Sequence, residues 1–528
     1  MFKLHHSQTG RRRISSKHLA QAGLLFLCAI GLLWMSVIEA KLEKRTDVLQ
    51  NVTITSNDRE ILLAWDLPFL TGIETLRVEI SGRNFSDVRY LPAQQKKFHF
   101  TEGVPGTRYG FSVTALYQDG SQGEEIQKQT MFLDESELPN LPVFFISTAS
   151  GEDPSSEAVQ APEGLWGASL TGNEYLNGNL IFHRPESREL SLKMKICVRG
   201  NTSSAYYEKK SYKIVLKEPV DLMDRGGRYA DQEWLLLNCG TTLNNSVGEF
   251  LSDLCGMEWS PHFMFVNVVL NGDWKGLYLL CESVSAGTAR VDVGRDGYIF
   301  ENDAYWWNSD GIYFKVDEQI DPLGFTFKYP KITDAQDPRI DVLKNYMQTV
   351  TTLIRTEDPA LWDYIDEDSF AAWIMVRDLM RQEDAGGSNM YYFIYSLEPG
   401  NPTEYQLKMG PLWDFDMALR ASETRFEQLN GWSAQHTISY TYFSYLFDTE
   451  YFTSLYRQKW NSLPQDALEQ FDRYLEQIAA TEGMDIQKSR ELDAERWGTA
   501  CTDLRQEIDY DKAFIRRQYE WITAELGG

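Results

Sequence analysis

The stretches Asp384-Ala-Gly-Gly-Ser-Asn389 and Gly410-Pro-Leu-Trp-Asp-Phe-Asp416 decide how the fold of this chain is interpreted, because they concentrate carboxylate and amide side chains in two short loops. In the first stretch an aspartate precedes an asparagine by five residues, the spacing of a phosphotransfer catalytic loop. In the second, Asp414 and Asp416 could hold a magnesium ion that bridges nucleotide phosphates. Together the two loops carry the residue types that metal-assisted phosphoryl transfer requires.

The roles of these residues follow from their expected positions. Residues 337–355 and 369–381 show helical spacing. Asp384 comes after the second of these patterns and before a strand pattern, so we expect it in a loop that accepts or orients the proton of a substrate hydroxyl group. Asn389 would give an amide oxygen to a second magnesium ion. Asp414 and Asp416 would point to the same side of an extended backbone, away from Phe415. The alternatives are a glycine-rich turn capped by Asp384 and a calcium or structural turn site at the two later aspartates.

Four motifs occur in one order along the chain: Arg199-Gly-Asn-Thr-Ser203, Lys209-Lys-Ser-Tyr-Lys213, Gly276-Leu-Tyr-Leu-Leu-Cys-Glu282 and the Gly410 stretch. In this order they resemble the spore coat protein H family of atypical kinases, and the resemblance runs from about Leu141 to the C-terminus. It implies an α+β fold with a two-lobed kinase-like domain over residues 142–528. It also implies ATP and Mg²⁺ (or Mn²⁺) as cofactors and a protein substrate with a Ser or Thr acceptor.

The resemblance implies nucleotide contacts from Arg199, Asn201 and Ser203, whose loop could let backbone amides approach phosphates. An ordinary hairpin turn is the alternative. In an extended segment Lys209 and Lys210 would point to opposite faces, so only one of them could reach the nucleotide. Lys210 is favoured over Lys209, and a solvated strand edge is the alternative for both.

Glu282 ends an apolar strand, where a carboxylate needs a cation or a hydrogen-bond donor. It could pair with the nucleotide lysine, form a structural salt bridge or lie at a strand end in solvent. The chain departs from the family where Gly240 and the pair Asn244-Asn245 stand in place of a common Asp and Arg. A supporting ion pair could therefore be missing, which would reduce or abolish activity.

The segment 48–132 shows short alternating strands separated by turn residues, which is typical of a β-sandwich. The run from Val104 to Gly120 resembles the end of a fibronectin type III module, with Tyr109 in the tyrosine corner and Trp65 as a core residue. Such a module could be a spacer or could bind proteins or glycans. The acidic, proline-containing segment 133–141 is predicted to be a linker to the main domain.

The first forty residues have a separate pattern. Arg11-Arg-Arg13 and Lys17 precede a run from Leu19 to Ile38 without charge, which at about 1.5 Å per residue gives roughly 30 Å of helix. We predict a cytoplasmic basic tail over 1–18 and a signal-anchor helix over 19–40, with the N-terminus inside and the main domains extracytoplasmic. A cleaved signal peptide is the alternative.

The composition of the chain excludes some classes of partner and of metal site. The chain has 528 residues and a formal net charge of −26, which argues against nucleic acid as a partner because a polyanion would be repelled. Its six cysteines form no C-x-x-C pair, so no zinc module is expected and most are predicted to be buried thiols. The sequence predicts a membrane-anchored atypical protein kinase of surface or envelope proteins. An inactive scaffold of the cell envelope, or a metal-dependent hydrolase or other transferase, is the alternative.

Overall fold

The computed structural model describes residues 49–527 except 57–59, 68–71, 105–106, 133–138, 166, 173, 186–188, 239–241, 318–320, 383, 385, 399–401 and 420–429. The predicted basic tail, the predicted signal-anchor helix and most of the predicted linker therefore lie outside the described residues. Within those that are described, no helix is both long enough and apolar enough to span a membrane. The chain divides into two compact units, one β-rich and one that reaches the C-terminus.

The N-terminal unit contains two sheets. Residues at alternate positions of several of its strands are buried, and the rings of Phe85 and Tyr109 from one sheet pack on Phe100 of the other. Trp65 is buried as well, and its indole Nε1 donates to the carbonyl of Gln95 at 2.8 Å. The sheets are β1 (Gln50–Ser56), β2 (Ile61–Asp66) and β5 (Lys97–Phe100), and β4 (Phe85–Pro92), β3 (Ile73–Gly82), β6 (Arg108–Tyr117) and β7 (Ile126–Met131).

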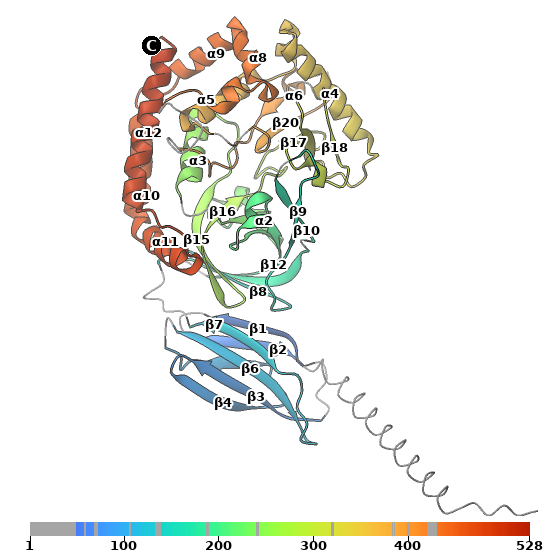
Figure 1. Cartoon of the computed structure of the whole chain (residues 1–528), viewed down its shortest axis with the longest axis vertical. Coiled ribbons are helices and arrows are strands. Elements are labelled where there is room, and N and C mark those ends of the chain that lie inside the picture. Colours follow the sequence, from blue (N-terminus) through green and yellow to red (C-terminus); the bar gives the residue numbers. More distant parts are fainter. Residues whose placement is uncertain are drawn as a thin grey trace, which may run out of the picture. The chain divides into compact units, whose positions relative to one another are not determined.

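The second unit begins with a closed barrel of seven strands, drawn in green tones in Figure 1. Neighbouring strands are antiparallel except β15 and β8, which pair in parallel and close the barrel. In barrel order the strands are β11 (Leu176–His183), β12 (Leu190–Arg199), β13 (Ser211–Val220), β14 (Asp231–Leu237), β16 (Asp273–Glu282), β15 (Phe263–Leu270) and β8 (Val143–Thr148).

Alternation along the barrel strands builds two cores. Trp234, Leu236 and Tyr278 point into the barrel, whereas Leu235 and Leu277 join the core beneath the helices. Most residues of β15, the last seven residues of β16 and the last four of β14 are buried, and these stretches are largely apolar rather than alternating. This packing fixes one rim of the barrel against the helical part of the unit.

The helical part surrounds a second sheet and a central helix, α5 (Glu367–Met380). Every residue of α5 from Phe370 to Met380 is buried, and the side chain of Asp366 caps its first turn by accepting from the amide of Ser369 at 2.8 Å. The sheet order is β18 (Tyr313–Phe314), β19 (Gly324–Tyr329), β17 (Tyr298–Asp303), β20 (Met390–Ile394) and β21 (Lys408–Met409).

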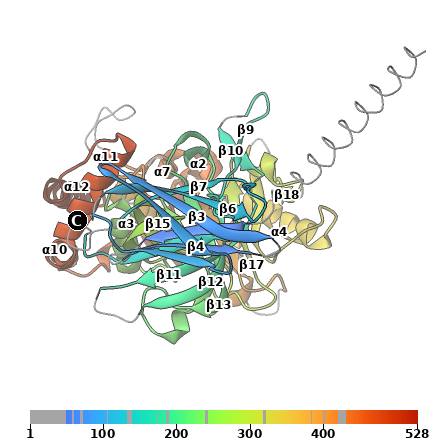
Figure 2. The ribbon, with the colours of Figure 1, turned by 90° about the horizontal axis from the view of Figure 1, so that it is seen from below.

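The remaining helices cover this core, and Figures 1 and 2 show α10, α11 and α12 lying side by side. They are α3 (Asn244–Cys255), α4 (Pro338–Arg355), α6 (Pro402–Tyr405), α7 (Ala434–Thr437), α8 (Phe443–Asp448), α9 (Glu450–Asn461), α10 (Ala467–Thr481), α11 (Gly483–Trp497) and α12 (Leu504–Glu525). Short elements complete the unit: β9 (Glu157–Gln160), β10 (Ala168–Thr171), α2 (Thr202–Tyr206), η1 (Gly227–Tyr229), η2 (Trp306–Asn308), η3 (Pro359–Asp363) and η4 (Ser439–Thr441).

The mixed α+β architecture confirms the coarse fold prediction. The helical patterns predicted over 337–355 and 369–381 correspond to α4 and α5. Of the described cysteines, Cys197, Cys255 and Cys281 are buried free thiols, as predicted for most of them, and Cys501 is exposed and also free.

Candidate active site

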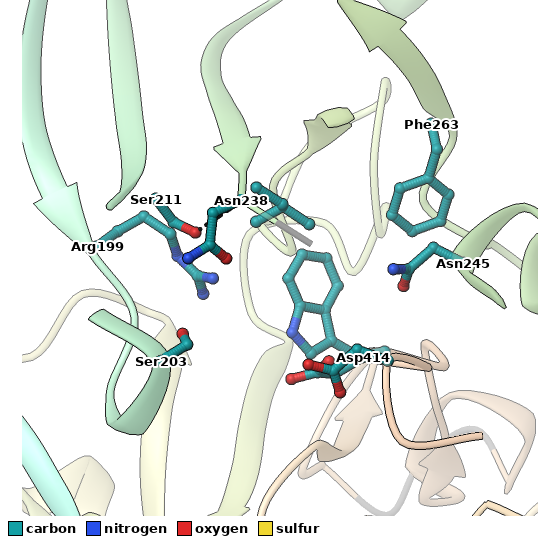
Figure 3. A pocket seen from close by; sticks show the side chains of 10 residues that line it. Arg199, Ser203, Ser211, Asn238, Asn245, Phe263 and Asp414 are labelled. Atoms are coloured by element: carbon teal, nitrogen blue, oxygen red, sulfur yellow. Dashed lines mark hydrogen bonds between the residues drawn. The ribbon is translucent and has the colours of Figure 1, made fainter. Parts of the chain in front are cut away.

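A pocket opens where the rim of the barrel meets the Gly410–Asp416 loop. It is lined from the strand ends, from α2 and α3, and from the loop. Figure 3 shows Arg199 and Ser203 on one side and Asp414 on the other. The full lining is Arg199, Ser203, Ser211, Leu237, Asn238, Asn245, Phe263, Trp413, Asp414 and Asp416.

The N-terminus of α3 holds the loop that carries the aspartates. The Asn244 amide Nδ2 donates to the carbonyls of Phe415 at 3.1 Å and Ala418 at 3.0 Å. The Asn245 Oδ1 accepts from the amide of Phe415 at 3.3 Å. Phe415 is buried directly over Gly248, where an added Cβ would come within 2.3 Å of its ring. A glycine is therefore required at that position of α3.

Asp414 and Asp416 both line the pocket, and Phe415 packs away from it. The sequence predicted this common direction from an extended backbone. The backbone is not extended, because Asp414 has a φ of 58° in the left-handed region. The two carboxylates share the pocket because the asparagines of α3 fix the turn.

Asp384 is exposed and belongs to the same electrostatic environment as Asp414. Burial raises the pKa of Tyr305, its hydrogen bond with Thr202 lowers that pKa, and the charges of Asp384 and Asp414 raise it further. Both aspartates also act on Arg377, where burial lowers the pKa and the two carboxylates oppose that change. The charges of Asp384 and Asp414 therefore act on the same two groups, Tyr305 and Arg377.

The loop between Asp384 and Asn389 is closed by the asparagine. Asn389 is buried with a φ of 64°, and its Nδ2 donates to the carbonyl of Asp384 at 3.0 Å. Its backbone amide donates to Oε1 of Glu301 at 3.1 Å, and Oε2 of Glu301 pairs with Lys328 at 2.8 Å. Since the amide nitrogen holds the loop, the oxygen of the Asn389 side chain is the atom that a cation would use.

Residues 196–522, more than half of the chain, match a family model described as CotH kinase protein. The chain belongs to this family. The matched CotH kinase region runs from β12 into α12 and includes Arg199, Asp384, Asn389, Asp414 and Asp416. The comparison with curated proteins gave no match.

The β-rich N-terminal region has fibronectin type III neighbours among solved structures. A two-domain segment of chicken tenascin is 10% identical over 32% of this chain and 90% of its own, with a TM-score of 0.16. The fn3 domain of human contactin 1 is 15% identical over 16% of this chain and 78% of its own, with a TM-score of 0.15. The twitchin kinase region of C. elegans is 7% identical over 40% of this chain and 45% of its own, with a TM-score of 0.18.

Of the candidate nucleotide residues in the CotH kinase region, Arg199 and Ser203 line the pocket. Arg199 ends β12, and its guanidinium lies 5.9 Å from the centre of the Trp413 ring. Asn201 is not among the lining residues, and its Oδ1 accepts from the Ser169 hydroxyl at 2.8 Å. Asn201 therefore holds the loop after β12 in place.

The structure does not bring the two candidate lysines to the pocket. Lys209 is buried, and its Nζ donates to Oδ1 of Asp493 at 2.7 Å and to the carbonyl of Leu277 at 2.5 Å. The amine of Lys210 donates to the carbonyls of Ser204 and Tyr207, each at 2.7 Å. The expected alternation does not apply, because β13 begins only at Ser211.

Glu282 pairs with arginines rather than with a nucleotide lysine. Its fully buried carboxylate accepts from Arg225 and, at 2.8 Å, from Arg290, and it also accepts from the backbone amide of His262 at 3.1 Å. Burial raises the pKa of Glu282, and the charges of Arg290 and Arg225 oppose the rise. The structural salt bridge, one of the three alternatives from the sequence, is what the structure contains.

The donor set fits a magnesium-type ion. Within the described residues no three His, Cys, Asp or Glu side chains gather in a way that could hold a metal. Mg²⁺, however, is commonly bound through one or two carboxylates together with substrate phosphates and water. Asp414 and Asp416 supply two hard oxygen ligands in one pocket, and neither Asn389 nor Asp384 is among the residues that line it.

Sequence reasoning missed Asn238, Tyr305 and Arg377, and it treated Asn245 only as a departure from the family. Arg377 is fully buried, its Nη2 donates to the carbonyl of Trp413 at 2.9 Å, and its Nε and Nη1 have no hydrogen-bond partner within the described part. The sequence signal for Arg377 was the charged pair Arg377-Asp378 inside the apolar run 370–380. A buried arginine needs a hydrogen-bond acceptor or an opposite charge beside it, so such a pair marks a position with specific contacts.

Proposed function

We propose that this chain is an atypical protein kinase that transfers the γ-phosphoryl group of ATP to Ser or Thr hydroxyl groups of surface or envelope proteins. The observation that carries the proposal is one pocket in a CotH kinase region that combines Arg199 and Ser203 with Asp414 and Asp416. The barrel and the helical part of the unit would correspond to the two lobes of a kinase, with the pocket at their junction.

Different residues of the pocket would contact the phosphates and the apolar parts of ATP. Arg199 would neutralise phosphate charge with its guanidinium, which can donate two parallel hydrogen bonds to a phosphate. Ser203 and Asn238 would add neutral hydrogen-bond donors, and Phe263 and Trp413 would cover apolar parts of the nucleotide. This assignment gives the phosphate-binding charge to an arginine and not to Lys209 or Lys210.

The carboxylates would serve the transfer itself. Asp414, Asp416 and Asn389 would hold Mg²⁺ or Mn²⁺, which when bound neutralises the charge on the phosphates. Asp384, in a loop tied by Asn389, would accept or orient the proton of the acceptor hydroxyl group. Its exposure suits a group that must meet a protein substrate.

For the cellular setting, we propose a single-pass membrane anchor over residues 19–40 with the N-terminus inside. The uncharged run from Leu19 to Ile38 after a basic segment supports this proposal. Both compact units would then face outward. The net charge of −26 supports protein rather than nucleic acid as the partner.

A specific observation favours an inactive scaffold as the second candidate. The amines of Lys209 and Lys210 are both engaged by groups outside the pocket. If phosphoryl transfer requires a lysine here, the fold would persist without turnover. The scaffold would then bind partners without consuming ATP.

The test is transfer of labelled phosphate from γ-labelled ATP by the purified protein with Mg²⁺ or Mn²⁺. Wild type should incorporate label, whereas Asp384→Ala and Asp414→Ala should lose it. Asp363→Ala is the matched control, because Asp363 is exposed in η3 and does not line the pocket. If wild type shows no label and ATP also fails to raise its melting temperature, the scaffold becomes the better description.

A further inference from the structure

A second concavity lies in the helical part of the same unit. It holds about 340 Å³, within the range of ligand-binding pockets, and is formed by the end of α4, by η3 and by the junction of α8 and α9. It shares no lining residue with the pocket that contains Asp414. We refer to it as the α4–α9 groove.

Aromatic and aliphatic side chains line the α4–α9 groove. The rings of Trp362 and Tyr451 lie 4.6 Å apart between centroids, and Tyr451 is 49% exposed. Ile354 and Leu446 are buried beneath them. An exposed aromatic surface in a concave site is suited to bind an apolar side chain or the flat face of a guanidinium group.

Four exposed carboxylates surround this apolar surface: Glu357, Asp358, Asp448 and Glu450. None of the lining residues is basic, and within the described part of the chain none of the four forms a salt bridge. Some exposed acids on other helices are paired, as Glu476 is with Arg505 and Lys512. The groove has no cation among its own lining residues.

We propose that the α4–α9 groove docks a basic segment of the acceptor protein, in which Arg or Lys residues flank an apolar side chain. The apolar side chain would pack on Trp362 and Tyr451. The flanking cations would meet the carboxylates that lack a cationic partner, which steers association and sets specificity. The identity of the occupant as an acceptor protein rests on the proposed kinase function. The groove would hold the acceptor away from the pocket and raise its effective concentration there.

Docking is measured without nucleotide, so that it does not depend on catalysis. The probe is a fluorescein-labelled peptide with arginines on both sides of a central leucine, and the readout is anisotropy with the full-length protein. Two charge reversals, Glu357→Lys with Asp448→Lys, should weaken binding at least tenfold. Asp448 ends α8, where a lysine favours the helix dipole, so the fold should tolerate that change.

The matched control carries the same change in net charge elsewhere. Glu495 and Glu520 are exposed on α11 and α12, so Glu495→Lys with Glu520→Lys should leave binding within twofold of wild type. If the groove pair and the control pair weakened peptide binding equally, the peptide would be attracted by net charge alone, and the proposed docking site would be rejected. The absence of binding to wild type would overturn it too.

A third variant tests the aromatic surface. Tyr451→Ala should weaken peptide binding about fivefold or more without changing net charge, and unchanged affinity would contradict the proposed packing. The two proposals can fail separately. Binding that responds to groove variants without any phosphate transfer would retain the docking site and reject the kinase. If phosphate transfer to a basic substrate is unaffected by the groove variants, the kinase function is retained and the docking site is rejected.

Discussion

Arg199 and Lys209 lie in neighbouring segments of the barrel rim, yet their charges meet different surroundings. Arg199 faces a pocket with two aspartates, whereas Lys209 is buried against Asp493. One residue is placed to bind a ligand and the other to neutralise a buried carboxylate. Replacing Arg199 should therefore weaken nucleotide binding with little loss of stability, whereas replacing Lys209 should lower stability and leave nucleotide binding unchanged.

Arg199→Ala should raise the KM for ATP by about tenfold to a hundredfold, since a hydrogen bond to a charged group contributes about 1.5–3 kcal/mol. Its melting temperature should change little, because Arg199 is only half-buried at the end of β12. Arg199→Lys should recover part of the affinity by keeping the charge without the planar fork. Steady-state kinetics across ATP concentrations measure the effect, and an unchanged KM in the alanine variant would contradict the assignment.

Lys209→Met should lower the free energy of unfolding by about 3 kcal/mol, because it leaves the buried Asp493 carboxylate without its cation. ATP affinity should stay the same. Urea denaturation measures the loss, and adding Asp493→Asn should recover part of it by removing the uncompensated charge. If the Lys209→Met variant were as stable as wild type but bound ATP more weakly, Lys209 would have to be assigned to nucleotide binding instead.

The roles of these two residues could not be read from the sequence. Alternation assigned the lysines to faces on the assumption that the strand included residue 209, and β13 begins at Ser211. The partner of Lys209 is 284 residues away in α11. Arg199, Ser203, Asp414 and Asp416 were predictable as a group because their motifs are local, and the structure places all four around one pocket.

At the scale of elements, α3 acts as the support of the aspartate loop. Asn244→Ala should remove the hydrogen bonds to Phe415 and Ala418 and lower the free energy of unfolding by about 1–3 kcal/mol. Asn244→Asp has nearly the same shape, yet it should be worse, because a carboxylate would face carbonyl oxygens without a proton to donate. Thermal melts at pH 7.5 should rank wild type above Ala and Ala above Asp. The reverse order of the two variants would show that Asn244 acts by shape alone.

In α12, Asp511 makes stability depend on pH. Burial raises its pKa to about 8, Glu507 adds to the rise and Arg490 opposes it. An unfolded aspartate titrates near pH 4, so between about pH 4 and pH 8 the folded protein holds a proton that the unfolded chain has released. Stability from this group is therefore present at low pH and is lost as the pH rises.

Asp511→Asn removes this titration while keeping the shape of the side chain. Between pH 5 and pH 7.5 the wild type should lose about 3 kcal/mol more than the variant. Chemical denaturation at the two pH values measures the difference. Parallel pH profiles for the two proteins would contradict a buried, protonated Asp511, and Asp509→Asn on the exposed side of α12 is the matched control.

For the whole molecule, local sequence patterns predicted which segments form helices better than they predicted which strands pair with each other. The periodicity of 337–355 and 369–381 was sufficient to predict α4 and α5. Closure of the barrel depends on β8 and β15, which pair in parallel although more than a hundred residues separate them. Such long-range pairing leaves no trace in a window of neighbouring residues, and strands buried on both faces lose the alternation that would mark their direction.

The net charge of −26 gives the last prediction, which concerns the whole chain. Mutual repulsion destabilises a compact acidic protein, and raising NaCl from about 0.01 M to about 0.1 M shortens the Debye length from about 30 Å to about 10 Å. The melting temperature at pH 7.5 should therefore rise by about 2–4 °C. At pH 5, close to the sequence pI of about 4.8, the same salt should have almost no effect. Salt should at the same time weaken binding of the basic peptide to the α4–α9 groove, because there it screens an attraction. If salt lowered both stability and binding at pH 7.5, attractive ion pairs rather than net repulsion would dominate the electrostatics of the folded chain.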